Sequence, residues 1–496
     1  MASKQATKSA FAEHGLNDTV DALIREVQQL YLVDDIPWVV GYSGGKDSTA
    51  TLQLVWLSVQ GLEPEQRTKP VHVITTDTLV ENPIVSAWVG KSLETINEAA
   101  QEQGLPIQSH QLTPQVEDTF WVNLIGRGYP APGAKFRWCT ERMKIKPSNR
   151  FINDMVKKNG EAILVLGTRK AESSKRKHRM TKLEGKRVRD RLSPNLSLPN
   201  SLVYSPVEDW TNDDVWMFLM QVQNPWGYNN KQLLTMYQGA SADGECPLVV
   251  DSSTPSCGDS RFGCWVCTLV DQDRSMSAMI QNDVEKEWML PLLELRDKLK
   301  AAGRDTRDFR RMQGHVQLFK GEPIPGPYKQ VTREDWLRQL LEAQTWVRAN
   351  GPEEVRQLEL ITLPEMQEIR RLWVVEKHEF EDTLPGIYQE ATGSEYPGGE
   401  LNSHSSFGAD EVAKLREVCG DDELHFELLR ELIDTEQQHR NLARRAGLFG
   451  KLENALRRGF YDNEADAKDR AVRRQQAREQ AESETPRQES LGLKSK

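Results

Sequence analysis

The six residues Ser43-Gly44-Gly45-Lys46-Asp47-Ser48 have the composition of an anion-binding loop. They lie between an apolar stretch at 36–40, which predicts a short buried strand, and a helical apolar pattern at 46–60. Paired glycines permit a positive-φ turn and a close approach of backbone N–H groups to an anion, and the helix dipole adds to the attraction. We therefore expect phosphate groups to bind here, against Tyr42, Ser43, Gly44, Gly45, Lys46, Asp47, Ser48 and Thr49.

The loop is not a Walker loop, because Val40 stands where that pattern needs glycine and Asp47 follows the lysine. It resembles the SGGxDS PP-loop of the ATP pyrophosphatases at every fixed position. That resemblance implies binding of ATP with Mg²⁺, reaction at the α-phosphate and release of pyrophosphate, with Lys46 and Asp47 as catalytic residues. The alternative is a glycine turn in an unrelated α/β protein, which the strand–loop–helix context disfavours.

Two further polar segments follow predicted strands. Asp77-Thr78 follows the strand at 71–74 and suits nucleotide or Mg²⁺ contacts, and the segment 167–176 follows the strand at 162–166. With 206–216, this second segment resembles the G-x-R-x-x-E-S-x-x-R and P-x-x-D-W-x-x-x-D-V-W patterns of the phosphoadenylyl-sulfate reductase superfamily. Guanidinium groups bind anionic oxygens well. The candidate nucleotide contacts in these segments are Asp77, Thr78, Gly167, Arg169, Glu172 and Arg176.

Four of the six cysteines lie within 22 residues, in a segment too rich in Gly, Ser, Asp and Pro to form a core. Four thiolates can hold tetrahedral zinc or an iron–sulfur cluster. Only one C-x₂-C pair is present, so the spacing favours a [4Fe–4S] cluster over zinc, and a group of reduced thiols without metal is the third interpretation. The expected metal ligands are Cys246, Cys257, Cys264 and Cys267.

Cys139 stands apart, within the basic segment 135–147. Neighbouring cations are expected to lower the pKa of its thiol, which would favour a reactive thiolate able to carry sulfur as a persulfide. A buried, inert cysteine is the alternative. Cys419 is interpreted as a packing residue.

The net charge of −10 is unevenly distributed, because residues 135–191 hold 19 Lys and Arg against 6 Asp and Glu. Such a tract can bind a polyanion. A solvated loop decorated with basic side chains is the alternative.

Alternating strands and helices predict an α/β fold with a doubly wound parallel sheet, whose ligands bind at the carboxyl ends of the strands. We expect a PP-loop domain at 15–240, a cysteine-rich iron–sulfur segment at 241–270, a mostly helical region at 271–465, and a charged, disordered tail at 466–496. A loop or flap is expected at 171–203. No apolar stretch reaches bilayer length and no secretory signal is evident, so a cytoplasmic location without a membrane partner is expected.

These motifs occur in one order along the chain, and together they resemble the DndC-type DNA phosphorothioation sulfurtransferases over roughly residues 20–345. The resemblance implies an adenine nucleotide alpha hydrolase-like fold, a [4Fe–4S] cluster and ATP pyrophosphatase activity. It also implies replacement of a non-bridging phosphate oxygen in DNA by sulfur. The implied partners are DNA, a cysteine desulfurase as sulfur donor, and other Dnd proteins in a modification complex.

Three other functions remain open. A sulfonucleotide reductase shares the core, but the chain has neither an adjacent cysteine pair nor a terminal Glu-Cys-Gly-type tail. A tRNA thiolase shares the loop and the clustered cysteines. A redox-sensing, nucleic-acid-binding iron–sulfur module is a non-enzymatic alternative, which pyrophosphate release from ATP would exclude.

Overall fold

The computed structural model describes residues 8–134, 136–189, 191–240, 263–401, 409–440 and 445–484. The chain divides into two compact units. Unit 1 comprises Met1–Phe120, Pro132–Lys300 and Ala343–Leu360, and unit 2 comprises Trp121–Ala131, Ala301–Glu342 and Ile361–Lys496. The boundaries predicted at 240 and 270 both fall within the range of unit 1 and stay predictions. Across the described ranges, no helix is long and apolar enough to cross a membrane.

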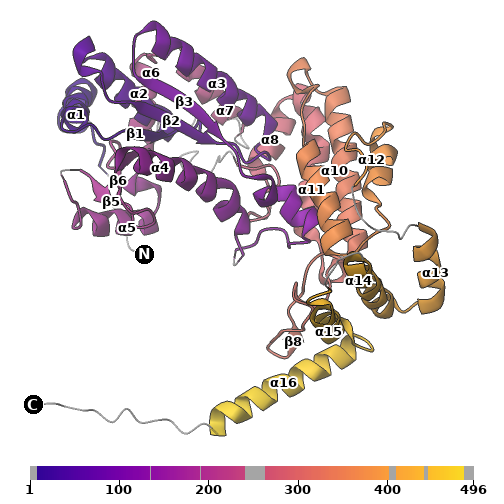
Figure 1. Ribbon diagram of the computed structural model, residues 1–496. Helices are drawn as coiled ribbons and strands as arrows, with labels where there is room; N and C mark the ends of the chain where they lie inside the picture. Colours follow the sequence, from indigo (N-terminus) through magenta and orange to yellow (C-terminus); the bar gives the residue numbers. More distant parts are fainter. Residues whose placement is uncertain are drawn as a thin grey trace, which may run out of the picture. The chain divides into compact units, whose positions relative to one another are not determined.

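Unit 1 is built on a six-stranded sheet in the order β3-β2-β1-β4-β6-β5 (Figure 1). All neighbouring strands are parallel except β5, which pairs antiparallel with β6. The strands are β1 (Trp38–Gly41), β2 (Val71–Thr76), β3 (Ile107–Leu112), β4 (Ala162–Val165), β5 (Ser193–Pro194) and β6 (Ser201–Tyr204). The α-helices are α1 (Gly15–Leu32), α2 (Lys46–Gln60), α3 (Pro83–Glu102), α4 (Lys146–Asn159), α5 (Ser174–Glu184), α6 (Asn212–Gln221), α7 (Asn230–Gly239), α8 (Arg274–Asn282) and α9 (Leu290–Ala301).

This topology confirms the predicted doubly wound sheet and locates its switch point. The chain moves outward from β1 through β2 to β3, then returns to the other side of β1 with β4. Loops that follow β1 and β4 therefore leave the same edge of the sheet side by side, which is where open α/β sheets bind ligands. The helix predicted at 46–60 corresponds to α2, and the strands predicted at 36–40, 71–74 and 162–166 correspond to β1, β2 and β4.

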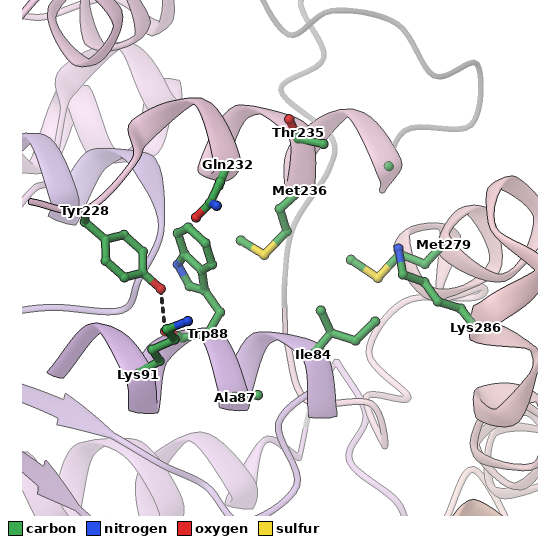
Figure 2. A pocket seen from close by; sticks show the side chains of 11 residues that line it. Ile84, Ala87, Trp88, Lys91, Tyr228, Gln232, Thr235, Met236, Met279 and Lys286 are labelled. Carbon is green, nitrogen blue, oxygen red and sulfur yellow. Dashed lines mark hydrogen bonds between the residues drawn. The ribbon is translucent and has the colours of Figure 1, made fainter. Parts of the chain in front are cut away.

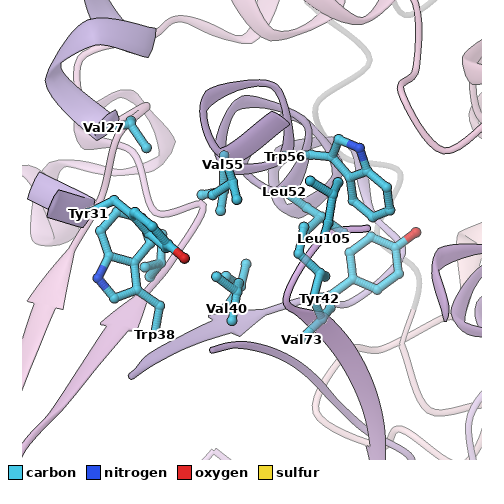
Figure 3. Close-up of a cluster of buried hydrophobic side chains, with 14 of the residues drawn as sticks. Val27, Tyr31, Trp38, Val40, Tyr42, Leu52, Val55, Trp56, Val73 and Leu105 are labelled. Carbon is cyan, nitrogen blue, oxygen red and sulfur yellow. The ribbon is translucent and has the colours of Figure 1, made fainter. Parts of the chain in front are cut away.

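The main core fills the sheet face covered by α1, α2 and α3 (Figure 3). Successive β1 residues point to opposite faces, so Trp38 and Val40 enter this core while Val39 packs under α4 on the other face. Tyr42, the first residue after β1, also lies in the main core, and its hydroxyl lies 2.6 Å from the Ser92 hydroxyl on α3. The core thus fixes the start of the SGGKDS loop.

A histidine pair lies on the α4 side of the sheet. His72 Nδ1 of β2 lies 3.0 Å from His110 Nε2 of β3, and the ring of Phe151 on α4 packs against both imidazoles. Burial lowers the pKa of both histidines, and the neighbouring charges of His110 and Lys158 add to the effect on His72. The folded protein therefore favours the neutral pair.

Acid should destabilise unit 1 through this pair. When the pH falls through about 6.5, the ordinary pKa of histidine, the unfolded chain takes up protons that the folded pair resists, so stability is lost as the pH decreases. We expect the fall in Tm between pH 7.5 and pH 5.5 to be smaller in His110→Gln than in the unaltered protein. The exposed His14→Gln is the control; an equal fall in all three proteins would contradict the assignment.

Two expectations about irregular segments were wrong. The predicted loop at 171–203 contains helix α5 as well as strands β5 and β6. The tail expected to be disordered from 466 is helical as far as 484 within α16 (Glu464–Glu484), and its last twelve residues lie outside the described residues. Helix α5 is hard to recognise from the sequence because it has almost no apolar periodicity. Its N-cap residue, Ser173, is its clearest local signal.

Unit 2 is helical apart from a short hairpin, as expected for the C-terminal region. Trp373 donates a hydrogen bond from Nε1 to Ile125 O at 3.0 Å, and Arg333 forms a buried ion pair with Glu379. The unit draws on β7 (Leu318–Phe319), β8 (Glu322–Pro323), α10 (Gln330–Asn350, shared with unit 1), α11 (Leu363–Arg371), α12 (Leu384–Thr392), α13 (Ala409–Cys419), α14 (Glu423–Arg440), α15 (Leu448–Gly459) and α16 (Glu464–Glu484).

Candidate functional site

The SGGKDS loop joins β1 to the N-terminus of α2. Gly44 has φ +70°, and a Cβ at this position would lie 2.6 Å from Val89 Cγ2, so both conformation and space require glycine. Gly45 is the N-cap residue of α2, and no side chain caps this helix end. A helix N-terminus that lacks a side-chain cap from its own N-cap residue suits an anion, and anion binding at this loop stays a prediction.

Hydrogen bonds within the loop set its shape before any ligand arrives. Ser43 N donates to Ser48 Oγ at 3.1 Å, and Ser48 Oγ donates to Gly45 O at 3.0 Å. Thr49, buried in the first turn of α2, donates its N–H to Gly45 O at 3.0 Å. Tyr237 of α7 closes the loop from outside, with its hydroxyl accepting from Lys46 N at 3.4 Å. Tyr237 was not predicted, because only the tertiary fold brings α7 to the loop.

Asp47 connects the loop after β1 to the loop after β4. Arg169 is 3% exposed and donates from Nε to Asp47 Oδ1 at 2.7 Å, and Lys46 Nζ lies 3.3 Å from Asp47 Oδ2. Arg169 also donates to Trp210 O at 3.2 Å. The guanidinium predicted to bind phosphate is therefore used mainly to hold Asp47, and Asp47 in turn orients Lys46.

The loop after β4 passes very close to the first turn of α2. A Cβ on Gly167 would lie 2.6 Å from Asp47 O and 3.0 Å from Ser48 N, so a larger residue here would push the two loops apart. Glu172 accepts from Arg169 N at 2.8 Å and pairs with Arg176, which is partly exposed at the start of α5. The predicted residues Gly167, Arg169 and Glu172 thus gather at Asp47, and Arg176 lies outside that group.

Asp77 and Thr78 follow β2, the strand next to β1, and their two side chains have different partners. The carboxylate of Asp77 accepts from Leu79 N at 2.8 Å and from Gln111 Nε2 at 2.9 Å. Burial raises the pKa of Asp77, and Glu81 adds to the rise while the two hydrogen bonds oppose it. Thr78 is fully buried and faces a thiol, because its hydroxyl donates to Glu81 Oε1 at 2.9 Å and lies 3.4 Å from Cys264 Sγ.

The Cys264–Cys267 segment is anchored beside the loop after β2. Trp265 N donates to Val80 O at 2.9 Å, and Cys264 Sγ lies 3.7 Å from Glu81 Oε1. Arg296 of α9 is fully buried and donates from Nε to Cys267 O at 2.9 Å. Burial raises the pKa of the Cys264 thiol to about 12. Glu81 and Arg296 position this segment, and no sequence pattern had marked either of them.

Cys139 belongs to the same cluster of sulfur atoms. It lies at the start of the π-helix Thr140–Ile145, close enough to Cys267 for their charges to interact, and Lys144 lies within electrostatic reach of Cys139 and Cys264. Burial raises the pKa of the Cys139 thiol, so the expectation that cations lower it was wrong. The cations are engaged elsewhere: Lys144 lies 3.3 Å from Glu81 Oε1 and Lys146 lies 2.9 Å from Asp118.

The predicted metal site is only partly visible. Cys246 and Cys257 lie outside the described residues, whereas Cys264 and Cys267 lie inside them. Within the described ranges, no three His, Cys, Asp or Glu side chains are placed to hold one metal ion. The [4Fe–4S] cluster at these four cysteines therefore stays a prediction.

Many cations of the basic tract at 135–191 form ion pairs. Arg142 and Lys146 pair with Asp118, and Arg187 and Arg191 pair with Glu208. Helix α5 groups four exposed cations that have no ion pair to a described carboxylate: Lys175, Lys177, Arg179 and Lys182. Its N-terminus directly follows the loop that contains Gly167 and Arg169.

The SGGKDS loop at the switch point of a mostly parallel sheet is the arrangement expected of the PP-loop class. Residues 37–269, slightly less than half of the chain, match the family described as the phosphoadenosine phosphosulfate reductase domain. An uncharacterized protein of Methanocaldococcus jannaschii, MJ0066, is 25% identical over 252 residues. That match spans 51% of this chain and 40% of the relative.

Two solved structures are similar to parts of the chain. The phosphoadenylyl-sulfate reductase of Candida auris, in a phosphate complex, has a TM-score of 0.26 and 14% identity, covering 41% of this chain and 86% of the other. The FMN adenylyltransferase of Candida glabrata, in complex with FAD and inorganic pyrophosphate, has a TM-score of 0.26 and 12% identity, covering 51% and 74%. Values this low carry no conclusion about activity.

Proposed function

We propose that this protein is an ATP-dependent sulfurtransferase of DNA phosphorothioate modification. A non-bridging oxygen of a DNA phosphodiester attacks the α-phosphate of ATP, pyrophosphate leaves, and sulfur then displaces AMP from the activated DNA phosphorus. One observation carries the proposal. The SGGKDS loop follows β1, the Cys264 thiol contacts Thr78 just after β2, and β1 and β2 are adjacent parallel strands. Phosphate activation and sulfur delivery therefore share one edge of the sheet.

The residues of the loop match the first half-reaction. The uncapped N-terminus of α2 would hold the β- and γ-phosphates, and Lys46 would stabilise the charge that develops on the departing pyrophosphate. Asp47, held by Arg169, keeps the lysine in position. Mg²⁺ would neutralise further phosphate charge, and we assign contact with it to Asp77, which directly follows β2.

For the second half-reaction we assign sulfur transfer to Cys139. Its persulfide, loaded by a cysteine desulfurase, attacks the activated phosphorus through the terminal sulfur, and AMP leaves with the former phosphate oxygen. A dithiol reductant then cleaves the sulfur–sulfur bond, leaves one sulfur on DNA and restores the Cys139 thiol. The positive charge of Lys144, near Cys139 and Cys264, would favour an anionic sulfur during this transfer.

A [4Fe–4S] cluster is part of the proposal, with Cys246, Cys257, Cys264 and Cys267 as its ligands and zinc as the alternative metal. Such a cluster would supply sulfur or electrons for the transfer. Its surroundings in the described residues are Arg296, which holds the Cys267 carbonyl, and Glu81 with Thr78, which contact the Cys264 thiol. Other Dnd proteins are proposed partners on the resemblance alone.

The DNA backbone is proposed to bind along α5. Lys175, Lys177, Arg179 and Lys182 offer unpaired positive charge immediately beyond the loop that holds Asp47. Phosphate contacts of this kind supply most of the non-specific affinity for DNA and weaken with salt.

The second candidate function is reduction of a sulfonucleotide, which the family match of residues 37–269 favours. This reaction would release sulfite from phosphoadenylyl sulfate and would need no ATP cleavage. The chain has no adjacent cysteine pair and no Glu-Cys-Gly-type tail, which favours sulfur transfer over this reduction.

The position of the incorporated sulfur tests the proposal. We expect the purified protein, given ATP, Mg²⁺, a persulfide donor and DNA, to form AMP, pyrophosphate and a phosphorothioate linkage that survives nuclease digestion as a dinucleotide. Mass spectrometry of the digest makes the measurement, and DNA without ATP is the control. Sulfur on a base would indicate a thiolase, and sulfite from phosphoadenylyl sulfate would indicate a reductase.

A further inference from the structure

A pocket of about 410 Å³ lies between α3, α7 and the segment after α8 in unit 1 (Figure 2). Trp88 and Lys91 line it from α3, Tyr228 and Met236 line it from α7 and the loop before it, and Met279 and Lys286 close the far side. This volume is within the roughly 300–1,000 Å³ range of small-molecule sites. None of these residues has a role in the ATP chemistry above.

One wall of the pocket lies against the SGGKDS loop. A Cβ on Gly44 would lie 3.4 Å from Trp88 Cδ1, so the indole that lines the pocket also backs the loop. Tyr237, one residue after Met236, contacts Lys46 N from α7. At its start, α3 is tied to the cysteine segment, because Asn82 N donates to Gly263 O at 3.4 Å. A group held here lies next to both halves of the proposed reaction.

The lining of the pocket is that of a site for a flat heterocycle. The rings of Trp88 and Tyr228 meet edge to face with centroids 4.5 Å apart, and two methionine side chains provide soft, polarisable walls. Trp88 Nε1 is buried and has no hydrogen-bond partner among the described residues, so a donor is available for a ligand. These features fit a nucleobase, which stacks on aromatic rings and carries acceptors on its edge.

Two lysines give the pocket positive charge on opposite walls. Lys91 is exposed and has no ion pair in the described part of the chain, whereas Lys286 lies 3.1 Å from Asp283 Oδ2. The adenosine moiety of ATP is uncharged, and its phosphates belong at the SGGKDS loop. A nucleoside within a DNA strand has a phosphate on each side, so it matches two separated cations.

We infer that this pocket takes one unstacked base of the acceptor DNA, with Lys91 and Lys286 on the flanking phosphates, and so sets which phosphodiester reaches the SGGKDS loop. The inference rests on the proposed function and names its substrate-positioning site. A base can enter such a pocket only after it leaves the duplex stack, so single-stranded DNA should bind more tightly than duplex.

Charge reversal tests the two lysines. The affinity of a fluorescein-labelled single-stranded oligonucleotide should fall about fivefold or more in Lys91→Glu and in Lys286→Glu, equivalent to about 1 kcal/mol per contact. The slope of log K against log salt should decrease by about 0.7 for each lost phosphate contact. The matched control is Arg25→Glu on the exposed side of α1. Unchanged affinity and slope in both lysine variants would overturn the inference.

Photo-crosslinking identifies the occupant. An oligonucleotide containing 5-iododeoxyuridine should crosslink to Trp88 or Tyr228, as located by peptide mass spectrometry, and excess MgATP should not prevent this. Labelling of the same two residues by 8-azido-ATP, with loss of the oligonucleotide crosslink, would make the pocket an adenine site and overturn the inference. Competition by adenosine 3′,5′-bisphosphate but not by oligonucleotide would overturn it in favour of a mononucleotide. Crosslinking by a protein that forms no phosphorothioate would retain the pocket and reject the sulfurtransferase.

Discussion

Lys46→Ala should lower the rate of pyrophosphate release from ATP by about 100- to 1,000-fold, the usual cost of removing a charge or donor aimed at a transition state. Lys46 Nζ is held 3.3 Å from Asp47, and Asp47 is held 2.7 Å from the buried Arg169, so the lysine is positioned before the nucleotide binds. Because this charge acts on the departing pyrophosphate, the loss should appear mainly in kcat. A coupled pyrophosphate assay with product chromatography makes the measurement.

Lys231→Ala is the matched control for this substitution. Lys231 is an exposed lysine of α7, the helix that also supplies Tyr237, and it does not touch the loop. It should retain the unaltered rate. Formation of ADP and orthophosphate by the unaltered protein, or full activity of Lys46→Ala, would refute the assignment of the loop to α-phosphate chemistry.

Cys139→Ser should abolish sulfur incorporation into DNA while pyrophosphate is still released. Cys139 lies near the Cys267 thiol and Lys144, whereas the residues assigned to ATP lie on the loops after β1 and β4. A serine hydroxyl cannot form a persulfide, so the activated DNA phosphate would return to phosphate by hydrolysis. Incorporation of radioactive sulfur into DNA and pyrophosphate release should be followed in the same reaction.

The iron and labile sulfide content of anaerobically purified protein shows whether Cys139 carries sulfur or is a ligand of the cluster. If Cys139 carries the transferred sulfur, Cys139→Ser should contain as much iron and sulfide as the unaltered protein. Loss of iron from this variant would reassign Cys139 to the metal. Cys419→Ser replaces a thiol at the end of α13 in unit 2 and should change neither quantity.

The sequence was informative where local chemistry and local structure coincide. The loop at Ser43–Ser48 could be found because paired glycines, a lysine and a following helix all lie within one short segment, and the strand–helix alternation gave the sheet. The doubly wound, parallel character of the sheet followed from general rules for α/β proteins, whereas the order of its strands and the antiparallel β5 were not predicted. The basic helix α5 was missed because an exposed, charged helix has no apolar stripe to reveal it.

The features of the site that the sequence did not reveal depend on contacts between distant segments. Nothing near Arg169 in the sequence indicates that it binds Asp47, and nothing near Glu81 indicates Cys264. The pKa of Cys139 was misjudged for a related reason, since sequence proximity to cations counts for little once carboxylates such as Asp118 and Glu81 pair with those cations and the thiol is buried.

The division of the chain also limits how the protein can be dissected. Unit 1 is completed by Ala343–Leu360, which follows a long excursion of the chain into unit 2, and unit 2 takes in Trp121–Ala131 from the middle of unit 1. Within unit 1, this returning segment packs close: a Cβ on Gly351 would lie 3.5 Å from Trp288 Cδ2. No single cleavage therefore yields either unit as one uninterrupted polypeptide, and shortening the protein after Lys300 would remove part of unit 1 itself.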